Sequence, residues 1–132
     1  MTLPEPSPRA NDAAREVVDA AIQVHRMLGP GLLESHYREA LAHELRRRGR
    51  TVEIEVPARV RYEGKTLRKS YSLDMRVDGE LVVELKATPK LLPVHLAQTS
   101  SYLAATGHHL AILLNFHAPR MKDGIRRVIR SR

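Results

Sequence analysis

The sequence predicts a single α/β domain, with a mixed sheet of four to five strands flanked by helices. Three observations lead to this fold class. Apolar residues recur at helical spacing in two segments before residue 50, apolar and polar residues alternate over 51–77, and an apolar run covers 110–116. Such a run is typical of a buried strand inside a partly parallel sheet. A chain of 132 residues is long enough to bury this core.

The N-terminal third predicts a leader and two helices. Residues 1–10 are proline-rich and are expected to form a flexible leader, which leaves 11–132 as the folded domain. Helical spacing then continues to Leu28, where the Gly-Pro-Gly sequence at 29–31 ends the first helix. A second helix is expected over 32–48, so the two helices meet at a tight corner.

Three antiparallel strands are expected next. The first covers 51–60, where Pro57 indicates an edge position or a bulge. A turn at 63–64 leads to a second strand over 65–77, and a third strand follows over 81–87.

The C-terminal part predicts a helix, a buried strand and one further short element. Pro89 and Pro93 lead into a helix that ends near Gly107. The buried strand over 110–116 follows, and its apolar character suits a parallel position. The basic tail beyond Pro119 is expected to form a short helix or a last strand.

The hairpin between the second and third strands has a register that sequence alone can select. A three-residue connection over 78–80 puts every apolar partner on one face, whereas a two-residue turn mixes polar and apolar residues on both faces. The apolar partners in the three-residue register are Leu73, Met75 and Val77 with Leu85, Val83 and Leu81. The same register sets Asp74 opposite Glu84.

Two opposed carboxylates repel each other and call for a compensating charge. A hard divalent cation such as Mg²⁺ (or Mn²⁺) would supply it, since such ions bind one or two carboxylates together with phosphate oxygens of a substrate. Lys86 falls on the same face and could orient a water or stabilise developing negative charge. The alternative is an exposed charge ladder in which Arg76 and Lys86 neutralise the two acids.

Residues of two helices are further candidates for this site. Glu34 falls within the apolar arc of the second helix, although an ion pair with Arg38 one turn later is the alternative. Gln98 and Tyr102 are spaced i, i+4 in the third helix, so both could lean over the sheet towards the hairpin. The alternative is a solvated glutamine and a tyrosine packed for its ring.

Composition narrows the function classes. The net charge of +7 and the pI near 10.2 favour polyanionic partners such as nucleic acid, although solvated basic residues alone can produce this balance. The absence of cysteine excludes disulfides, thiolate metal sites and a cysteine nucleophile. The histidines lack ligand spacing for zinc. No apolar run is long enough to span a bilayer, so a cytoplasmic protein without a membrane partner is expected.

Taken together, these residues resemble the metal site of the PD-(D/E)XK nuclease superfamily, which combines an acid on one strand, an acid-x-Lys on the next and a helix glutamate. Asp74, Glu84-Leu85-Lys86 and Glu34 match those roles in the expected order. Gln98 and Tyr102 reproduce the Gln-x-x-x-Tyr spacing of the RecB-like branch. The resemblance implies a restriction-endonuclease-like fold.

A more specific resemblance is to the GxxExxY protein family, whose name pattern stands here as Gly31, Glu34 and Tyr37. It covers about residues 13–130 and includes the stretches VHRMLGPGLLESHYREALAHEL, VELKA, PVHLAQTSSYLAATG and NFHAPRMKDGIRRVI. Leu73 stands where the nuclease motif has proline, and no accessory DNA-reading domain is evident.

The resemblance implies a role for each site residue. Asp74, Glu84 and the Leu85 carbonyl would bind the metal, with Glu34 as a direct or water-mediated ligand. Lys86 would activate water, and Gln98 and Tyr102 would support the lysine or a phosphate of the substrate.

The resulting hypothesis is a metal-dependent nuclease that hydrolyses phosphodiester bonds of DNA or RNA. The alternative is a non-catalytic nucleic-acid-binding or protein-interaction module that keeps the nuclease fold, and a homodimer is compatible with both.

Overall fold

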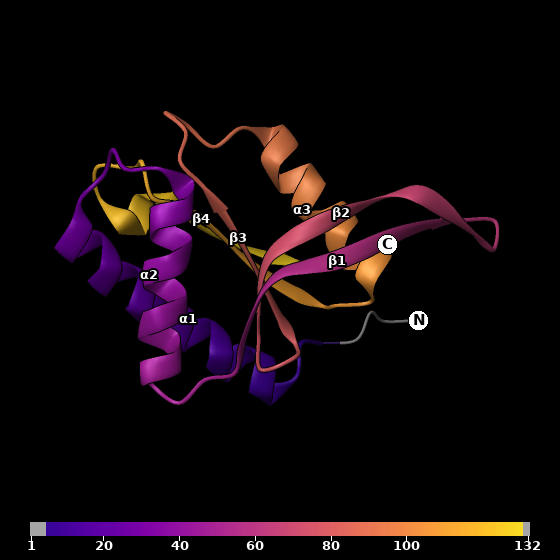
Figure 1. Cartoon of the computed structure of the whole chain (residues 1–132), viewed down its shortest axis with the longest axis horizontal. Helices are drawn as coiled ribbons and strands as arrows, with labels where there is room; N and C mark the ends of the chain where they lie inside the picture. The colour runs from indigo at the N-terminus through magenta and orange to yellow at the C-terminus, as the bar shows by residue number, and fades with distance from the viewer. Residues whose placement is uncertain (1–4, 131–132) are drawn as a thin grey trace.

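The computed structural model describes residues 5–130, which form one five-stranded mixed sheet between two helical layers (Figure 1). In chain order the elements are α1 (Pro8–Leu28), α2 (Glu34–Arg47), β1 (Val52–Tyr62), β2 (Lys65–Val77), β3 (Leu81–Lys86), α3 (Pro93–Thr106), β4 (Leu110–Asn115), the 3-10 helix η1 (Met121–Gly124) and β5 (Ile125–Ile129). The strand order is β1-β2-β3-β4-β5, and only β3 and β4 are parallel. The predicted fold class is confirmed.

The helix α1 begins earlier than the sequence predicts. Ser7 is its N-cap and accepts a hydrogen bond from the Ala10 amide over 3.0 Å, and Pro8 occupies the first turn, where its missing N–H costs nothing. Residues 8–10, expected in the flexible leader, therefore belong to the helix. Residues 1–4 of that leader and 131–132 of the predicted domain lie outside the described residues.

The sheet has a separate apolar core on each face. On one face, α1 and α2 bury their apolar sides together with Met75, Val83 and Ile112. On the other face, α3 packs Leu103 over a smaller cluster. The other members of that cluster are Ala58, Leu73, Val82, Ala111 and Val128. Both faces of the central strands are covered, as the apolar run of β4 predicts.

The parallel pair β3 and β4 carries the two carboxyl-terminal strand ends to the same edge of the sheet. α3 forms the crossover between them, and the paired residues run from Leu81 with Leu110 to Lys86 with Asn115. β4 is buried along its whole length. The tail then forms both elements that the sequence left open, the helix η1 and the edge strand β5.

The hairpin between β2 and β3 has the predicted register over its paired part. Val77 pairs with Leu81 and Met75 pairs with Val83, and the ladder ends there. The expectation that Leu73 shares the face of Met75 is wrong, because Leu73 packs in the cluster beneath α3 and Met75 in the cluster beneath α1 and α2.

A distortion of β1 coincides with this change of face. Glu55 has a left-handed backbone (φ 54°), which is rare for a residue with a side chain, and it stands across from Asp74 without joining the ladder. Pairing resumes on either side, between Ile54 and Met75 and between Val56 and Leu73.

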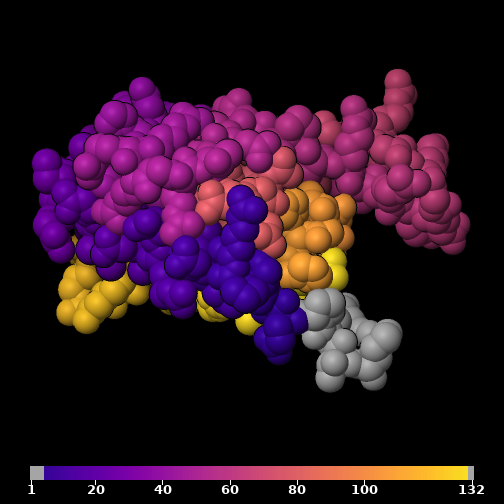
Figure 2. Space-filling view, turned by 90° about the horizontal axis from the view of Figure 1, so that it is seen from below, coloured from indigo at the N-terminus to yellow at the C-terminus, as the bar shows by residue number. Residues whose placement is uncertain are grey.

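The far ends of β1 and β2 extend past the helices as a two-stranded ribbon, seen at the right of Figure 1 and as a protrusion in Figure 2. β1 is an edge strand, as Pro57 predicted. Residues 61–70 of the ribbon are all exposed. Among the described residues, no helix has the length and apolar character to cross a membrane.

Candidate active site

Asp74 and Glu84 meet where the ladder between β2 and β3 stops. The Asp74 amide donates to Glu84 Oε1 over 3.3 Å, and the Leu85 amide donates to Asp74 Oδ2 over 2.8 Å. Beyond the last backbone pair of this ladder, carboxylate oxygens accept the hydrogen bonds between the strands. Each carboxylate accepts from a backbone amide of the opposite strand. Glu84 is 4% exposed and Asp74 is partly exposed.

The environment of Glu84 favours its protonated form. Burial raises the pKa of Glu84 well above its usual range, and the Asp74 carboxylate raises it further, while Lys86 opposes the shift. A proton on Glu84 relieves the repulsion between the two side chains. A buried carboxyl with a raised pKa beside a second acid is typical of a functional site.

The alternative of an exposed charge ladder does not hold. Arg76 pairs with Glu53, through contacts of 2.7 and 2.8 Å, instead of neutralising Asp74. Glu84 is buried, so its charge is not a solvated surface charge. The pair therefore lacks the arginine that would make it a structural ion pair.

Lys86 is the last residue of β3, two residues after Glu84. Its positive charge is close enough to lower the pKa of both Glu34 and Glu84, although other causes raise both values overall. Asn115 lies beside it on β4 and is buried. The Asn115 side chain binds both backbone groups of Thr88, at 3.1 and 2.9 Å, and so anchors the segment that follows Lys86. Sequence analysis did not identify this role.

Glu34 is the first residue of α2, and the corner before it sets its position. Gly31 has a φ of 105°, which a residue with a side chain rarely adopts. The Tyr37 hydroxyl accepts from the Leu32 amide over 3.0 Å and donates to the Gly29 carbonyl, and its ring stacks on Phe116. The Gly-x-x-Glu-x-x-Tyr pattern thus describes one corner with a glutamate at its end.

Glu34 belongs to the electrostatic environment of the acid pair. Burial raises the pKa of Glu34 and the Asp74 carboxylate adds to the rise, whereas Lys86 and Arg38 oppose it. The proposed alternative, an ion pair between Glu34 and Arg38, is not formed, because Arg38 pairs with Glu55 over 3.2 Å.

The two candidates on α3 differ in how far the structure brings them to the site. The Tyr102 ring stacks on Tyr71 with centroids 4.1 Å apart, and burial, Glu84 and Asp74 raise the pKa of Tyr102. The side chain of Gln98, one turn earlier, is exposed and makes no hydrogen bond to residues 5–130. The structure thus connects Tyr102, but not Gln98, with the acid pair.

Tyr71 is a site neighbour that sequence analysis missed. Its hydroxyl is buried and has no hydrogen-bond partner in the described part of the chain. Burial raises the pKa of Tyr71, and Tyr102 and Glu84 contribute to the rise. Strict alternation along β2 would place Tyr71 on the face away from Asp74, but Tyr71 packs with Leu73 beneath α3 and is close enough to Glu84 for that acid to raise its pKa.

The donor set suits a hard divalent cation held by two carboxylates. Asp74 and Glu84 are in contact without an arginine, and a cation would replace the proton that Glu84 otherwise retains. No group of three or more histidine or acidic side chains within residues 5–130 is arranged to hold a metal ion. Additional ligands would therefore be backbone oxygens, water and substrate oxygens, as is usual for Mg²⁺.

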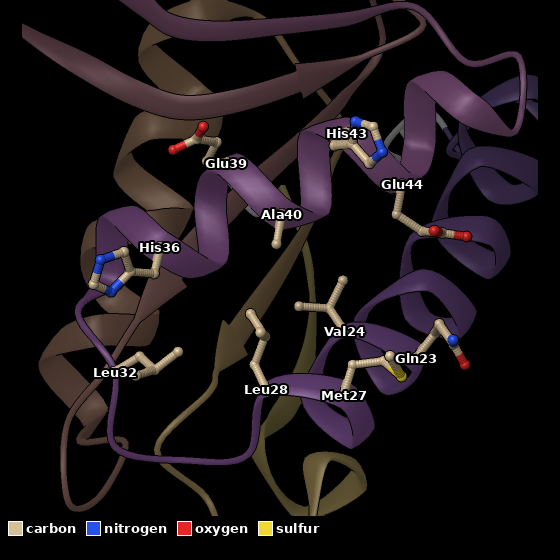
Figure 3. Close-up of a pocket in the computed structure, with 10 residues that line it drawn as sticks. All are labelled: Gln23, Val24, Met27, Leu28, Leu32, His36, Glu39, Ala40, His43 and Glu44. Atoms are coloured by element: carbon tan, nitrogen blue, oxygen red, sulfur yellow. The ribbon is translucent and has the colours of Figure 1, made fainter.

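A separate groove of about 700 Å³ lies between α1 and α2 (Figure 3). Val24, Leu28 and Ala40 point into the space between the two helices, and Glu39 and His43 lie along its edge. None of the acid pair, Lys86 or Glu34 lines this groove, so it is distinct from the candidate active site.

Comparison with solved structures supports the fold. The crystal structure of SSO0001 matches with a TM-score of 0.57 at 18% sequence identity, covering 100% of this chain and 71% of that chain. An identity this low establishes likeness of fold alone. The comparison with curated proteins gives no match.

Comparison with protein families gives a match over most of the chain. The matching family is described as the PD-(D/E)XK nuclease superfamily, and the match covers residues 11–128. This range includes the acid pair, Lys86 and the corner that positions Glu34. The chain therefore belongs to the PD-(D/E)XK nuclease superfamily.

Proposed function

We propose that this protein is a metal-dependent nuclease that hydrolyses phosphodiester bonds of DNA or RNA, and that it is a GxxExxY member of the superfamily related to the RecB-like branch. The observation that carries the proposal is the contact between Asp74 and buried Glu84, with Lys86 two residues further along the same strand. A cytoplasmic location, as the sequence predicts, would give it access to nucleic acid.

Each residue has a role that follows from its position. Asp74, Glu84 and the Leu85 carbonyl would hold Mg²⁺ or Mn²⁺, with Glu34 reaching the ion through water. Such an ion neutralises charge on the phosphate and increases the acidity of bound water. Lys86 would donate to the attacking water or to a phosphate oxygen, because its ammonium is close enough to Glu34 and Glu84 to influence the pKa of both.

The aromatic pair would shape the side of the site formed by α3. The rings of Tyr102 and Tyr71 stack on each other, and Glu84 contributes to the raised pKa of both tyrosines. Gln98 is exposed one turn away on the face of Tyr102, where it would contact the substrate phosphate rather than the lysine.

A cleavage assay tests the proposal. The protein is incubated with single- and double-stranded DNA and RNA in Mg²⁺, in Mn²⁺ and in chelator. We expect metal-dependent cleavage of at least one substrate, and a loss of about 100-fold or more in rate for Asp74→Ala and for Lys86→Ala.

Matched controls are available on α1. Asp19 is exposed and pairs with Arg48, which follows the C-terminal end of α2, whereas Glu34 is at the N-terminal end of that helix. Arg15 is also exposed. Asp19→Ala and Arg15→Ala remove the same kinds of charge and should leave cleavage unchanged. If no substrate is cut, or if the Asp74 and Lys86 variants cut normally, the catalytic proposal is wrong.

The second candidate is a non-catalytic nucleic-acid-binding or protein-interaction module. It is favoured by the observation that only two acidic side chains come together, with no third ligand side chain among residues 5–130. Nucleic-acid binding that is salt-sensitive, independent of metal and unchanged by Asp74→Ala would support it. Mass measurement with and without nucleic acid would show whether a homodimer forms.

A further inference from the structure

The ribbon formed by residues 59–70 is a strongly basic part of the molecule that protrudes from it. We define these residues as the arm, and Figure 2 shows them projecting beyond the rest of the chain. The arm contains five basic residues and one acidic residue, Glu63. The basic residues are Arg59, Arg61, Lys65, Arg68 and Lys69. More than half of the chain's net charge of +7 therefore comes from twelve residues.

The arm cations differ from most arginines of the domain in having no acidic partner. None of the five forms an ion pair within residues 5–130. By contrast, Arg48, Arg50 and Arg76 each bind one or more carboxylates at 3.0 Å or less. Unpaired cations on an exposed element repel one another, and an anionic partner would remove that cost.

The side chains of the arm are also too exposed to contribute to the hydrophobic core. Residues 61–70 are all exposed, and Tyr62 near the tip is 66% exposed. The pairing of β1 with β2 shifts register between Arg59 and Arg61, so the ribbon is irregular at this point. Ser70 is paired with Arg59 and Thr66 with Arg61, so each arginine has a hydroxyl residue as its cross-strand neighbour. Neighbouring arginine and hydroxyl groups are suited to phosphate oxygens.

From this arrangement we infer that the arm binds duplex DNA by entering its major groove. This inference rests on the proposed nuclease function, which it extends by naming the substrate class. The major groove of B-form DNA is about 12 Å wide and admits a two-stranded ribbon, whereas the major groove of A-form RNA is too narrow for side chains to read. A single strand offers no groove for a ribbon to enter.

The position of the arm relative to Asp74 suits one continuous duplex. The second strand of the arm and Asp74 both lie on β2, where Asp74 is nine positions after Lys65. At a rise of about 3.3 Å per residue, that separation is about 30 Å, close to one helical turn of DNA. A duplex whose backbone reaches the acid pair would therefore present its groove to the arm within the next turn.

The test compares two double variants of identical chemistry. Arg59→Gln/Arg68→Gln removes two charges from the arm, and Arg9→Gln/Arg15→Gln removes two from α1, where both arginines are exposed and paired with acids. Binding is measured in chelator, so that cleavage does not contribute, on duplex DNA of about two helical turns, on its single strand and on the matching duplex RNA.

We expect the arm variant to weaken duplex DNA binding by about tenfold and to lower the slope of log affinity against log salt by about 2. The α1 variant should have a much smaller effect, and the arm variant should affect single strands and duplex RNA little. Thermal unfolding of both variants should match the parent protein, because the arm residues are exposed.

Three results would overturn the inference. Equal losses in both double variants would show general charge attraction, and equal losses on all three nucleic acids would show that no groove is read. A change in oligomeric mass without a change in DNA affinity would make the arm a protein interface. These outcomes are separate from the nuclease proposal, which depends on Asp74 and Lys86 in the cleavage assay.

Discussion

Glu84 is a buried acid whose ionised form is unfavourable in the folded protein. It is buried against a second carboxylate and has no arginine partner among the described residues. Its hydrogen bond from the Asp74 amide fixes the carboxyl group without supplying a full positive charge. The folded protein therefore favours the protonated acid, and removal of the proton is opposed by both burial and Asp74.

The variant Glu84→Gln should be more stable than the parent protein at pH 8. A raised folded pKa gives stability that is complete below the usual glutamate pKa and is lost as the pH rises toward the raised value. The amide resembles the protonated acid and does not ionise, so it avoids this loss. We expect the difference to grow by up to about 1.4 kcal/mol per pH unit within that window, as measured by urea unfolding from pH 4 to 8.

Glu53→Gln is the matched control for this prediction. The hydrogen bond from Arg76 lowers the pKa of Glu53, so its contribution has the opposite sign and is present above the usual pKa. Addition of Mg²⁺ at pH 8 should restore stability to the parent protein but not to Glu84→Gln. A stability difference for Glu84→Gln that does not change with pH would contradict the account of this carboxyl.

At the scale of elements, the corner between α1 and α2 carries Glu34 toward the acid pair. Tyr37 is fully buried and satisfies two backbone groups of that corner, the Gly29 carbonyl and the Leu32 amide. Its ring stacks on Phe116 just beyond β4. The tyrosine of the pattern thus connects the corner with the edge of the sheet where Lys86 lies.

Removal of the Tyr37 hydroxyl should therefore affect both stability and Glu34. Tyr37→Phe keeps the ring contact but leaves two backbone groups without their partner, and we expect a loss of about 1–2 kcal/mol in unfolding free energy. Cleavage should also fall, because the first turn of α2 is less well held. Tyr62→Phe on the exposed arm is the control and should change neither. Unchanged unfolding of Tyr37→Phe would show that the ring alone holds the corner.

Local patterns in the sequence predict most of these elements. Helical spacing and the glycine and proline residues mark α1, α2 and α3, and alternation marks β2 with its observed bounds. The turn register follows from matching apolar faces, and it correctly brings Asp74 beside Glu84. These features depend on neighbours in sequence or on one hairpin, so periodicity is sufficient to predict them.

Other features depend on contacts between distant segments, and the sequence patterns do not contain them. The left-handed backbone at Glu55 occurs on β1, opposite the point on β2 where Leu73 and Met75 face different clusters. Tyr71 therefore lies near Glu84, a position that strict alternation along β2 would not predict. The ion pairs of Arg38 with Glu55 and of Arg76 with Glu53 likewise depend on how the elements pack.

At the scale of the whole molecule, an ion-pair network connects α1 with the hairpin that carries the acid pair. Arg50 follows α2 and binds Asp12 of α1 at 2.7 Å and Asp78 of the β2–β3 turn at 2.8 Å. Asp78 also accepts from the Thr51 amide over 3.1 Å. Neighbouring Arg48 binds Glu16, Asp19 and Glu44. The network fixes the turn end of the hairpin, at the opposite end of β3 from Lys86.

Arg50→Gln should therefore lower the melting temperature by about 5 °C at pH 7, because Asp78 is left poorly paired in a mostly buried position. The hydrogen bond from Arg50 lowers the pKa of Asp12, so this stabilisation is present above the usual aspartate pKa and is lost as the pH falls through the lowered value. The difference between variant and parent should thus be complete at pH 7 and shrink below about pH 4.

Arg120→Gln breaks an exposed pair within one short segment and should change the melting temperature little. A loss for Arg50→Gln that is equal at pH 3 and pH 7 would mean that packing of the arginine side chain, rather than its ion pairs, connects α1 to the hairpin.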